Sequence, residues 1–107
     1  MGAREGGVSS DKKITDSARD EYCLIRIPGC PQNNLTTVFC HSNTLASGRG
    51  YSYKSFSLCG AYGCQFCHDV VDGRRPKPDG WSRNDVRLAF YEGHERTLVR
   101  LHEKGLV

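Results

Sequence analysis

The sequence predicts a small α+β domain in which metal-bound cysteines replace part of the hydrophobic core, with a long helix at the C-terminus. The chain has 107 residues, only 37% of them hydrophobic, and it contains six cysteines. One compact domain needs about 100 to 200 residues, and domains this short often depend on a metal or on disulfides. Short β-forming runs precede two helical patterns, as in an α+β domain.

Residues 1–20 are predicted to be a flexible N-terminal tail, and residues 21–107 the folded domain. The tail is rich in Gly, Ser, Asp and Lys and has almost no large hydrophobic side chain, so we expect little structure beyond a helical turn near Ser17. It lacks the apolar segment of a secretion signal and any run approaching the roughly 18 residues of a membrane span. We therefore expect a reducing cytoplasm, where cysteines bind metal more often than they form disulfides.

Two pairs of cysteines have spacings that suit a structural zinc ion. Cys64 and Cys67 form a C-x2-C pair, and Cys23 and Cys30 form a wider pair around a Pro-Gly turn. Four thiolates suit the tetrahedral coordination of Zn2+. One alternative is a disulfide between Cys23 and Cys30. Another is a thiol–disulfide oxidoreductase site at Cys64 and Cys67, although no βαβ pattern surrounds this pair.

A strand that ends at a histidine is predicted from the run LTTVFCH, residues 35–41. His41 would lie where strand becomes loop, a position in which an imidazole can act as a general base on water; its plainer role is a capping hydrogen bond. The next residues, 42–53, are rich in Gly, Ser and Asn and are interpreted as a functional loop. Cys40 and Cys59 are interpreted as buried core side chains.

A second short strand is expected at residues 56–58, followed by a turn over residues 60–63 and a helix over residues 64–72 that a glycine ends. In that helix His68 and Asp72 are four residues apart, so their side chains share one face and could hold a divalent ion. A pair of this kind is more often a hydrogen bond or a solvated ion pair.

Ser82 offers the N-cap of a long helix that runs to about Lys104. Its hydrophobic stripe consists of Val86, Phe90, Leu98 and Leu101. Gly93 interrupts the pattern and costs roughly 1 kcal/mol relative to Ala, so we expect a kink or a break into two helices there. The helix is long enough to pair two copies of the chain, and a homodimer is a further expectation.

The net charge of +3 permits a nucleic-acid partner without requiring one. Several cations flank the proposed ligands and would form a basic rim for backbone phosphates, although solvation is the ordinary role of each: Arg49, Lys54, Arg74, Arg75 and Lys77. Tyr51 and Tyr53 could stack on unpaired bases, whereas Trp81 is interpreted as a packing residue. No helix has an Arg or Asn face suited to the major groove, so we expect little sequence preference.

Together these motifs resemble the HNH (ββα-metal, His-Me finger) endonuclease superfamily, in which a histidine ends the first strand of a hairpin and a helix opening with C-x2-C-H supplies further ligands. Within it the chain is most similar to the small prophage-encoded nucleases of the YbcO type. The similarity rests on CLIRIPGC, on the strand-end histidine and on AYGCQFCHDVVDGR, and it covers roughly residues 17–107.

The resemblance implies an HNH fold and a DNA endonuclease, with little sequence preference, that takes part in phage or prophage DNA recombination or processing in a bacterial host cell. It makes His41 the general base and His68 and Asp72 the ligands of a catalytic Mg2+ or Mn2+. It assigns the structural zinc to Cys23, Cys30, Cys64 and Cys67. The competing interpretation is a non-catalytic, zinc-stabilised module that binds nucleic acid.

The chain departs from the superfamily pattern at two positions. Cys40 stands where many members have an Asp or His metal ligand, and Ser57 stands at the usual middle Asn. A thiolate is a poor ligand for Mg2+, so we expect a water molecule in place of Cys40.

Overall fold

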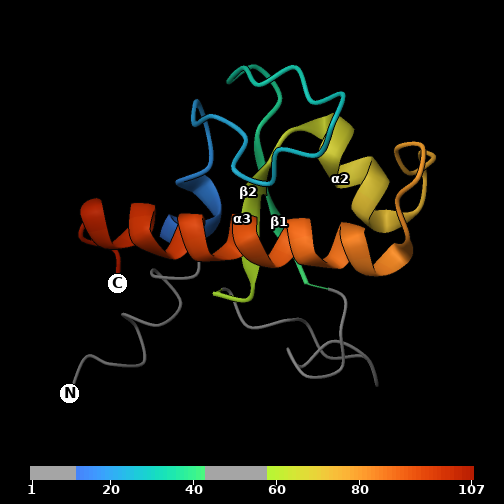
Figure 1. The fold of residues 1–107 in the computed structure, drawn as a ribbon. Helices are drawn as coiled ribbons and strands as arrows, with labels where there is room; N and C mark the ends of the chain where they lie inside the picture. The colour runs from blue at the N-terminus through green and yellow to red at the C-terminus, as the bar shows by residue number, and fades with distance from the viewer. Residues whose placement is uncertain (1–11, 43–57) are drawn as a thin grey trace.

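The computed structural model describes residues 12–42 and 58–107, in which a two-stranded antiparallel sheet is combined with two helices (Figure 1). The elements are β1 (Val38–His41), β2 (Gly60–Gly63), α2 (Gln65–Asp72) and α3 (Arg83–Glu103). A short helical segment over residues 12–16 precedes them. The predicted α+β class and the long C-terminal helix are confirmed. No helix in the described ranges is long and apolar enough to cross a membrane.

The second strand lies where the sequence predicted a turn. β2 occupies residues 60–63 and pairs with β1, with His41 opposite Gly60. Of the strand expected at residues 56–58, only Leu58 is described, and it is not in a strand. The turn prediction was wrong because these glycines serve close packing. A Cβ at Gly60 would lie 2.5 Å from the Phe39 ring.

The ends of both helices lie where the sequence predicts them. Cys64 is the N-cap of α2, and Gly73 ends the helix in the left-handed conformation with φ 83°. Ser82 is the N-cap of α3 and forms a capping box with Asp85. These caps satisfy backbone groups that have no partner inside the helix, so short polar motifs define both boundaries.

The long helix α3 crosses the strands and contacts the outer edge of β2 (Figure 1). The backbone N–H of Tyr62 donates to Thr97 Oγ1, and its carbonyl accepts from Leu24 N, both at 2.9 Å. Gly93 allows this approach, since a Cβ there would lie 2.8 Å from Ile25 Cα. α3 is continuous, so the expected break at Gly93 is not found. This glycine is needed for packing against the neighbouring loop.

Buried side chains form two clusters, and strand alternation places them on opposite faces of the sheet. The first, which we call the cysteine core, contains Cys23, Ile25, Ile27, Cys40, Ala61, Cys64, Cys67, Val70, Val86, Ala89 and Phe90. The second, the tyrosine core, contains Ile14, Ala18, Phe39, Tyr62 and Leu101.

The hydrophobic core begins earlier in the chain than predicted. Ile14 and Ala18 are 4% and 1% exposed and pack in the tyrosine core. Ser17 Oγ lies 2.7 Å from Tyr62 Oη, so this segment is also hydrogen-bonded to the sheet. Two isolated apolar residues among Lys and Asp give little sequence pattern, which is why this contribution was missed. The division into a tail and a domain at residue 20 stays a prediction.

Candidate metal centre

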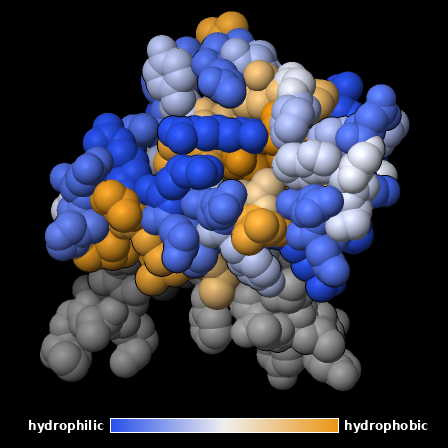
Figure 2. Space-filling model, viewed as in Figure 1, coloured by the Kyte–Doolittle hydropathy of each residue, from blue (hydrophilic) through white to orange (hydrophobic). Residues whose placement is uncertain are grey.

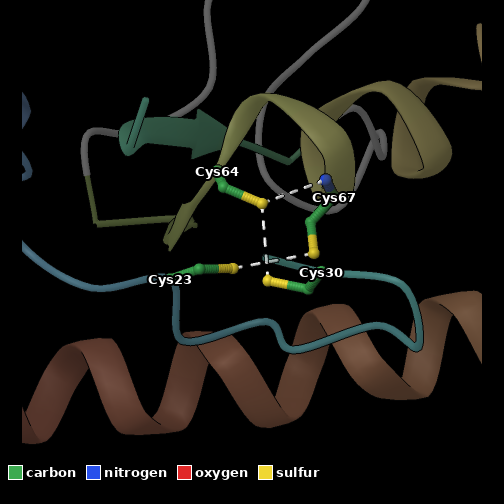
Figure 3. A group of neighbouring side chains, drawn as sticks. All are labelled: Cys23, Cys30, Cys64 and Cys67. Carbon is green, nitrogen blue, oxygen red and sulfur yellow. Dashed lines mark hydrogen bonds between the residues drawn. The ribbon is translucent and has the colours of Figure 1, made fainter. Parts of the chain in front are cut away.

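Four cysteine sulfurs meet at one point of the cysteine core (Figure 3). The Sγ atoms of Cys23, Cys30, Cys64 and Cys67 all lie within 4.8 Å of one another. The Cys23–Cys67 distance is 3.6 Å and the Cys30–Cys64 distance is 3.5 Å. In a regular tetrahedral site with Zn–S bonds of about 2.3 Å, the sulfurs are about 3.8 Å apart. The donor set and its spacing therefore fit a zinc ion.

The four sulfurs come from two segments that are far apart in the sequence. Cys64 and Cys67 lie in the first turn of α2, where Cys64 Sγ accepts from Cys67 N at 3.4 Å. Cys23 and Cys30 bracket a loop that turns at residues 28–29. All six cysteines are free, so the alternative disulfide between Cys23 and Cys30 is not present. A cation held here would join the loop to α2.

Backbone amides point at the sulfurs of the N-terminal pair. Gln32 N donates to Cys30 Sγ at 3.3 Å, and the backbone of Arg26 hydrogen-bonds to Cys23. Arg26 and Gln32 both have positive φ, 62° and 53°, although neither is glycine. This conformation costs roughly 1–2 kcal/mol for an L-residue. Arg26 and Gln32 are therefore strained at the positions where their backbone groups hydrogen-bond to the sulfurs.

The crowded sulfurs perturb the acidity of one another. The hydrogen bond with Cys67 lowers the pKa of Cys23 to about 4, and the same contact raises the pKa of Cys67. Burial raises the pKa of Cys30 to about 12. Thiols this close cannot all ionise without a positive charge between them, and metal ions bind thiolates with release of the protons. The cluster is thus suited to a divalent cation.

The two remaining cysteines differ from each other. Cys40 is 1% exposed, as predicted. Burial is the main cause that raises the pKa of its thiol, and the negative charges of Cys23 and Asp72 raise it further. Cys59 is only partly buried, so the prediction of a core position was wrong for it. Cys59 directly precedes β2, outside the four-sulfur cluster.

The pair predicted on α2 is formed. His68 Nε2 lies 3.1 Å from Asp72 Oδ2, and the two side chains are 29% and 19% exposed. Arg74 Nη2 lies 3.2 Å from the same Asp72 oxygen and 3.1 Å from Asp69. Among the described residues, this pair belongs to no group of three or more metal ligands. A divalent ion at Asp72 would compete with the Arg74 guanidinium.

His41 ends β1, as predicted, and among the described residues it forms no group of three or more potential metal ligands with His68 and Asp72. The His41 ring packs edge-on against Phe39, with centroids 5.1 Å apart. Phe39 belongs to the tyrosine core, whereas Cys40 faces the cysteine core together with Val70 of α2. Successive strand residues point to opposite faces, so His41 and Cys40 lie on different sides of the sheet.

The predicted basic rim is described only in part. Several residues singled out from the sequence lie outside the described ranges: Arg49, Tyr51, Tyr53, Lys54 and Ser57. Arg74 pairs with the carboxylates of α2, and Arg75 lies over the Phe66 ring, 4.8 Å from its centroid. Lys77 is exposed. Trp81 packs against the cysteine core, which confirms its structural role.

Two residues of α3 make contacts that the sequence did not reveal. Arg83 donates to the carbonyls of Val70 and Val71 at the end of α2, where a cation is favourable. His94 Nδ1 lies 2.6 Å from the carbonyl oxygen of Gly60. Both positions are helical and polar, and nothing in their spacing distinguishes them from solvent-facing residues. Only the packing of α3 onto the hairpin brings them into contact.

Comparison with known proteins identifies relatives of the whole described region. A family model described as "Putative nuclease YbcO" matches residues 12–106. A solved structure described as "a putative bacteriophage protein from Escherichia coli str. K-12 substr. MG1655" is 27% identical, with a TM-score of 0.65. The match covers 85% of this chain and 98% of that one. No functionally curated protein matches the chain.

Proposed function

The chain belongs to the family described as "Putative nuclease YbcO", and from this premise we propose that it is a metal-dependent endonuclease of the HNH type. The observation that carries the proposal is the family match over residues 12–106. The His68–Asp72 pair on a helix that also bears two of the four clustered cysteines supports it. The reaction is hydrolysis of DNA phosphodiester bonds.

In this proposal the four clustered cysteines hold a structural zinc ion that never contacts the substrate. It would fix the loop of Cys23 and Cys30 against the first turn of α2. Three of the four sulfurs belong to residues that are 2% exposed or less: Cys23, Cys64 and Cys67. A site this enclosed leaves no open coordination position for a substrate, which is the mark of a structural zinc site.

His68 and Asp72 would hold the catalytic divalent ion, Mg2+ or Mn2+. When bound there, the ion supplies positive charge to the scissile phosphate and to the leaving oxygen. Asp72 would turn from Arg74 to the ion, which frees the Arg74 guanidinium to bind a phosphate oxygen. His41 would take the proton from the attacking water from its place at the end of β1, without itself binding the ion, because imidazole can accept a proton near neutral pH.

The proposed substrate is DNA that is recognised through its backbone, with little sequence preference. Four cations would contact the phosphates: Arg49, Lys54, Arg74 and Arg75. The phage protein among the relatives supports a role in phage or prophage DNA recombination or processing. Zinc thiolates need reduced cysteines, so we place the protein in the cytoplasm of a bacterial host cell.

Cleavage assays with single-stranded, duplex and branched DNA test the proposal. Each substrate is incubated with Mg2+ or Mn2+ and with wild-type protein, His41→Ala, His68→Ala and His102→Ala. His102 is exposed in the last turn of α3, so its variant is the matched control. We expect metal-dependent cleavage by wild type and His102→Ala only. Full activity in His41→Ala would remove His41 from the mechanism.

A second function, a zinc-stabilised module that binds nucleic acid without cleaving it, is favoured by two observations. The His41 ring lies beside Phe39, and the His68–Asp72 pair has no third ligand among the described residues. Under this alternative, DNA binding would be measurable in a mobility-shift assay while every divalent ion fails to support cleavage.

Pairing of two copies is a separate part of the proposal. The face of the molecule that carries α3 is mostly hydrophilic, with separate hydrophobic patches between the polar side chains (Figure 2). Leu88, Tyr91 and Val99 of α3 are 57%, 47% and 59% exposed and would lie in the interface. Sedimentation of wild type and Leu88→Glu would detect such a dimer and its loss.

A further inference from the structure

We propose that His94 of α3 is a positioning residue for His41 and acts through the backbone of Gly60. The catalytic meaning of this proposal rests on the proposed function, since His41 is there the general base. The structural part stands independently. His94 was not among the candidate residues from the sequence, and it contacts the hairpin only because α3 packs against β2.

His41 and Gly60 face each other across the antiparallel pair of strands. One residue further along, Ser42 N donates to the carbonyl of Cys59 at 2.7 Å. Hydrogen-bonded and non-hydrogen-bonded pairs alternate in an antiparallel ladder. The pair of His41 and Gly60, which follows in the register, is therefore of the non-bonded kind. In such a pair the Gly60 carbonyl points away from β1, toward α3.

The Gly60 carbonyl is hydrogen-bonded to His94 of α3 and not to β1. His94 Nδ1 lies 2.6 Å from the Gly60 carbonyl oxygen, on the outer edge of β2. A carbonyl oxygen can only accept, so the hydrogen must be on Nδ1. At the neighbouring outward residue the direction is reversed, since Tyr62 N donates to Thr97 Oγ1. Thus two side chains of α3 fix two successive outward-facing peptides of β2.

The position of Gly60 affects the His41 ring through Phe39. A Cβ at Gly60 would lie 2.5 Å from the Phe39 ring, so this ring sits directly on the glycine. The same ring packs edge-on against His41, with centroids 5.1 Å apart. A shift of the Gly60 peptide would therefore move the Phe39 ring and with it the His41 ring. His94 fixes the Gly60 carbonyl, and through Gly60 and Phe39 it restrains the His41 ring.

The test compares two substitutions at His94 with a matched control on the same helix. His94→Leu removes the donor and keeps much of the volume. His94→Asn keeps an N–H donor close to the position of Nδ1. His102→Leu removes another α3 histidine whose Nδ1 contacts only the carbonyl of Val107 at 3.3 Å, among described residues. Zinc content and far-UV circular dichroism are recorded for every variant.

The first readout is the structure around His41, measured by NMR without any substrate. In His94→Leu we expect changed His41 ring shifts, a changed His41 titration and roughly tenfold faster amide exchange at Ser42, because local opening becomes easier. His94→Asn and His102→Leu should behave as wild type. Unchanged spectra in His94→Leu, or equal changes in His94→Asn, would overturn the proposal.

The second readout is cleavage. Displacement of a catalytic group by about 1 Å can cost roughly a hundredfold in rate, so His94→Leu should lower kcat tenfold or more while KM stays within about twofold. His94→Asn should restore kcat. A raised KM with unchanged kcat in His94→Leu would contradict a positioning role.

A measurement on the unmodified protein keeps the proposal testable if a variant fails to fold. Nitrogen-15 shifts of His94 report its tautomer, and the proposal requires the hydrogen on Nδ1. A neutral ring protonated on Nε2 would overturn it. If wild type cleaves no DNA, the proposed nuclease function fails, whereas the tautomer and the His41 spectra still decide whether His94 positions His41.

Discussion

The two faces of the hairpin differ in the side chains that are buried on them. On one face, the cysteine core brings four sulfurs within 4.8 Å of one another, an arrangement that could hold a metal ion such as zinc. On the other face, the tyrosine core consists of apolar and aromatic side chains around Tyr62, which is fully buried. One core is thus filled by packing alone, whereas the other includes a set of side chains that could coordinate a metal.

The two cores also join different parts of the chain. The cysteine core connects the loop of Cys23 and Cys30 with the start of α2. The tyrosine core connects the segment around Ile14 and Ala18 with the end of α3. Beside it, Glu21 pairs with Arg100 at 3.1 Å and with Lys104 at 2.7 Å. Separate substitutions can therefore be directed at each core.

The largest effect should come from loss of the metal. Cys67→Ser removes one of four sulfurs, and structural zinc contributes roughly 10 kcal/mol or more to the folding of small domains. We expect no stoichiometric zinc and no cooperative thermal transition. Cys59→Ser, at a cysteine outside the cluster, should keep one zinc per chain. A zinc-free Cys67→Ser protein that melts like wild type would show that packing alone supports this face.

Truncation in the tyrosine core should be the next largest effect. Leu101 is fully buried there, and Leu→Ala in a core costs about 2–5 kcal/mol. The variant should unfold at lower denaturant concentration and still bind zinc, because Leu101 is in the other cluster. Leu88→Ala, on the exposed side of α3, is the control. Loss of zinc from folded Leu101→Ala would show that the two cores are coupled.

The ion pairs of Glu21 should contribute about 1 kcal/mol, as expected for pairs near the surface. Burial favours the neutral acid, but hydrogen bonds and charges from Arg100 and Lys104 outweigh it and lower the pKa of Glu21. The folded-state pKa is thus below the unfolded value, so this contribution is complete above the unfolded pKa and is lost as pH falls through the folded one.

Denaturant titrations of wild type and Glu21→Gln at several pH values measure this contribution. Wild type should be the more stable near neutral pH, and the difference should shrink below the ordinary glutamate pKa of 4.5. A pH-independent difference would assign the effect to packing. Glu103→Gln, at the more exposed carboxylate near Arg100, provides the comparison.

The smallest effect should be a small gain in stability of the loop that carries Cys23 and Cys30. Arg26→Gly relieves the cost of a positive φ, roughly 1–2 kcal/mol, although glycine costs about 0.5–1 kcal/mol in unfolded-chain entropy. A net gain of up to about 1 kcal/mol should appear as slower release of zinc to a chelator. Lys77→Gly removes a cation at an exposed loop position without positive φ and should not slow release.

Several features could be predicted because they depend on neighbours in the sequence. The C-x2-C spacing, the N-cap at Ser82 and the helix end at Gly73 are local patterns with direct structural consequences. The position of β2 could not be predicted in this way. GAYG has the composition of a turn, and its strand character comes from β1 on one side and α3 on the other.

The sequence by itself determined which residues can hold a metal and where the helices begin and end, because ligand chemistry and capping act over a few residues. The predicted meeting of Cys23 and Cys30 with Cys64 and Cys67 is found, but only the tertiary structure decided that Ile14 reaches the core and that the His41 ring lies beside Phe39. These outcomes depend on how α3 packs across the hairpin. That packing is a sum of contacts between residues distant in the chain, and no single segment encodes it.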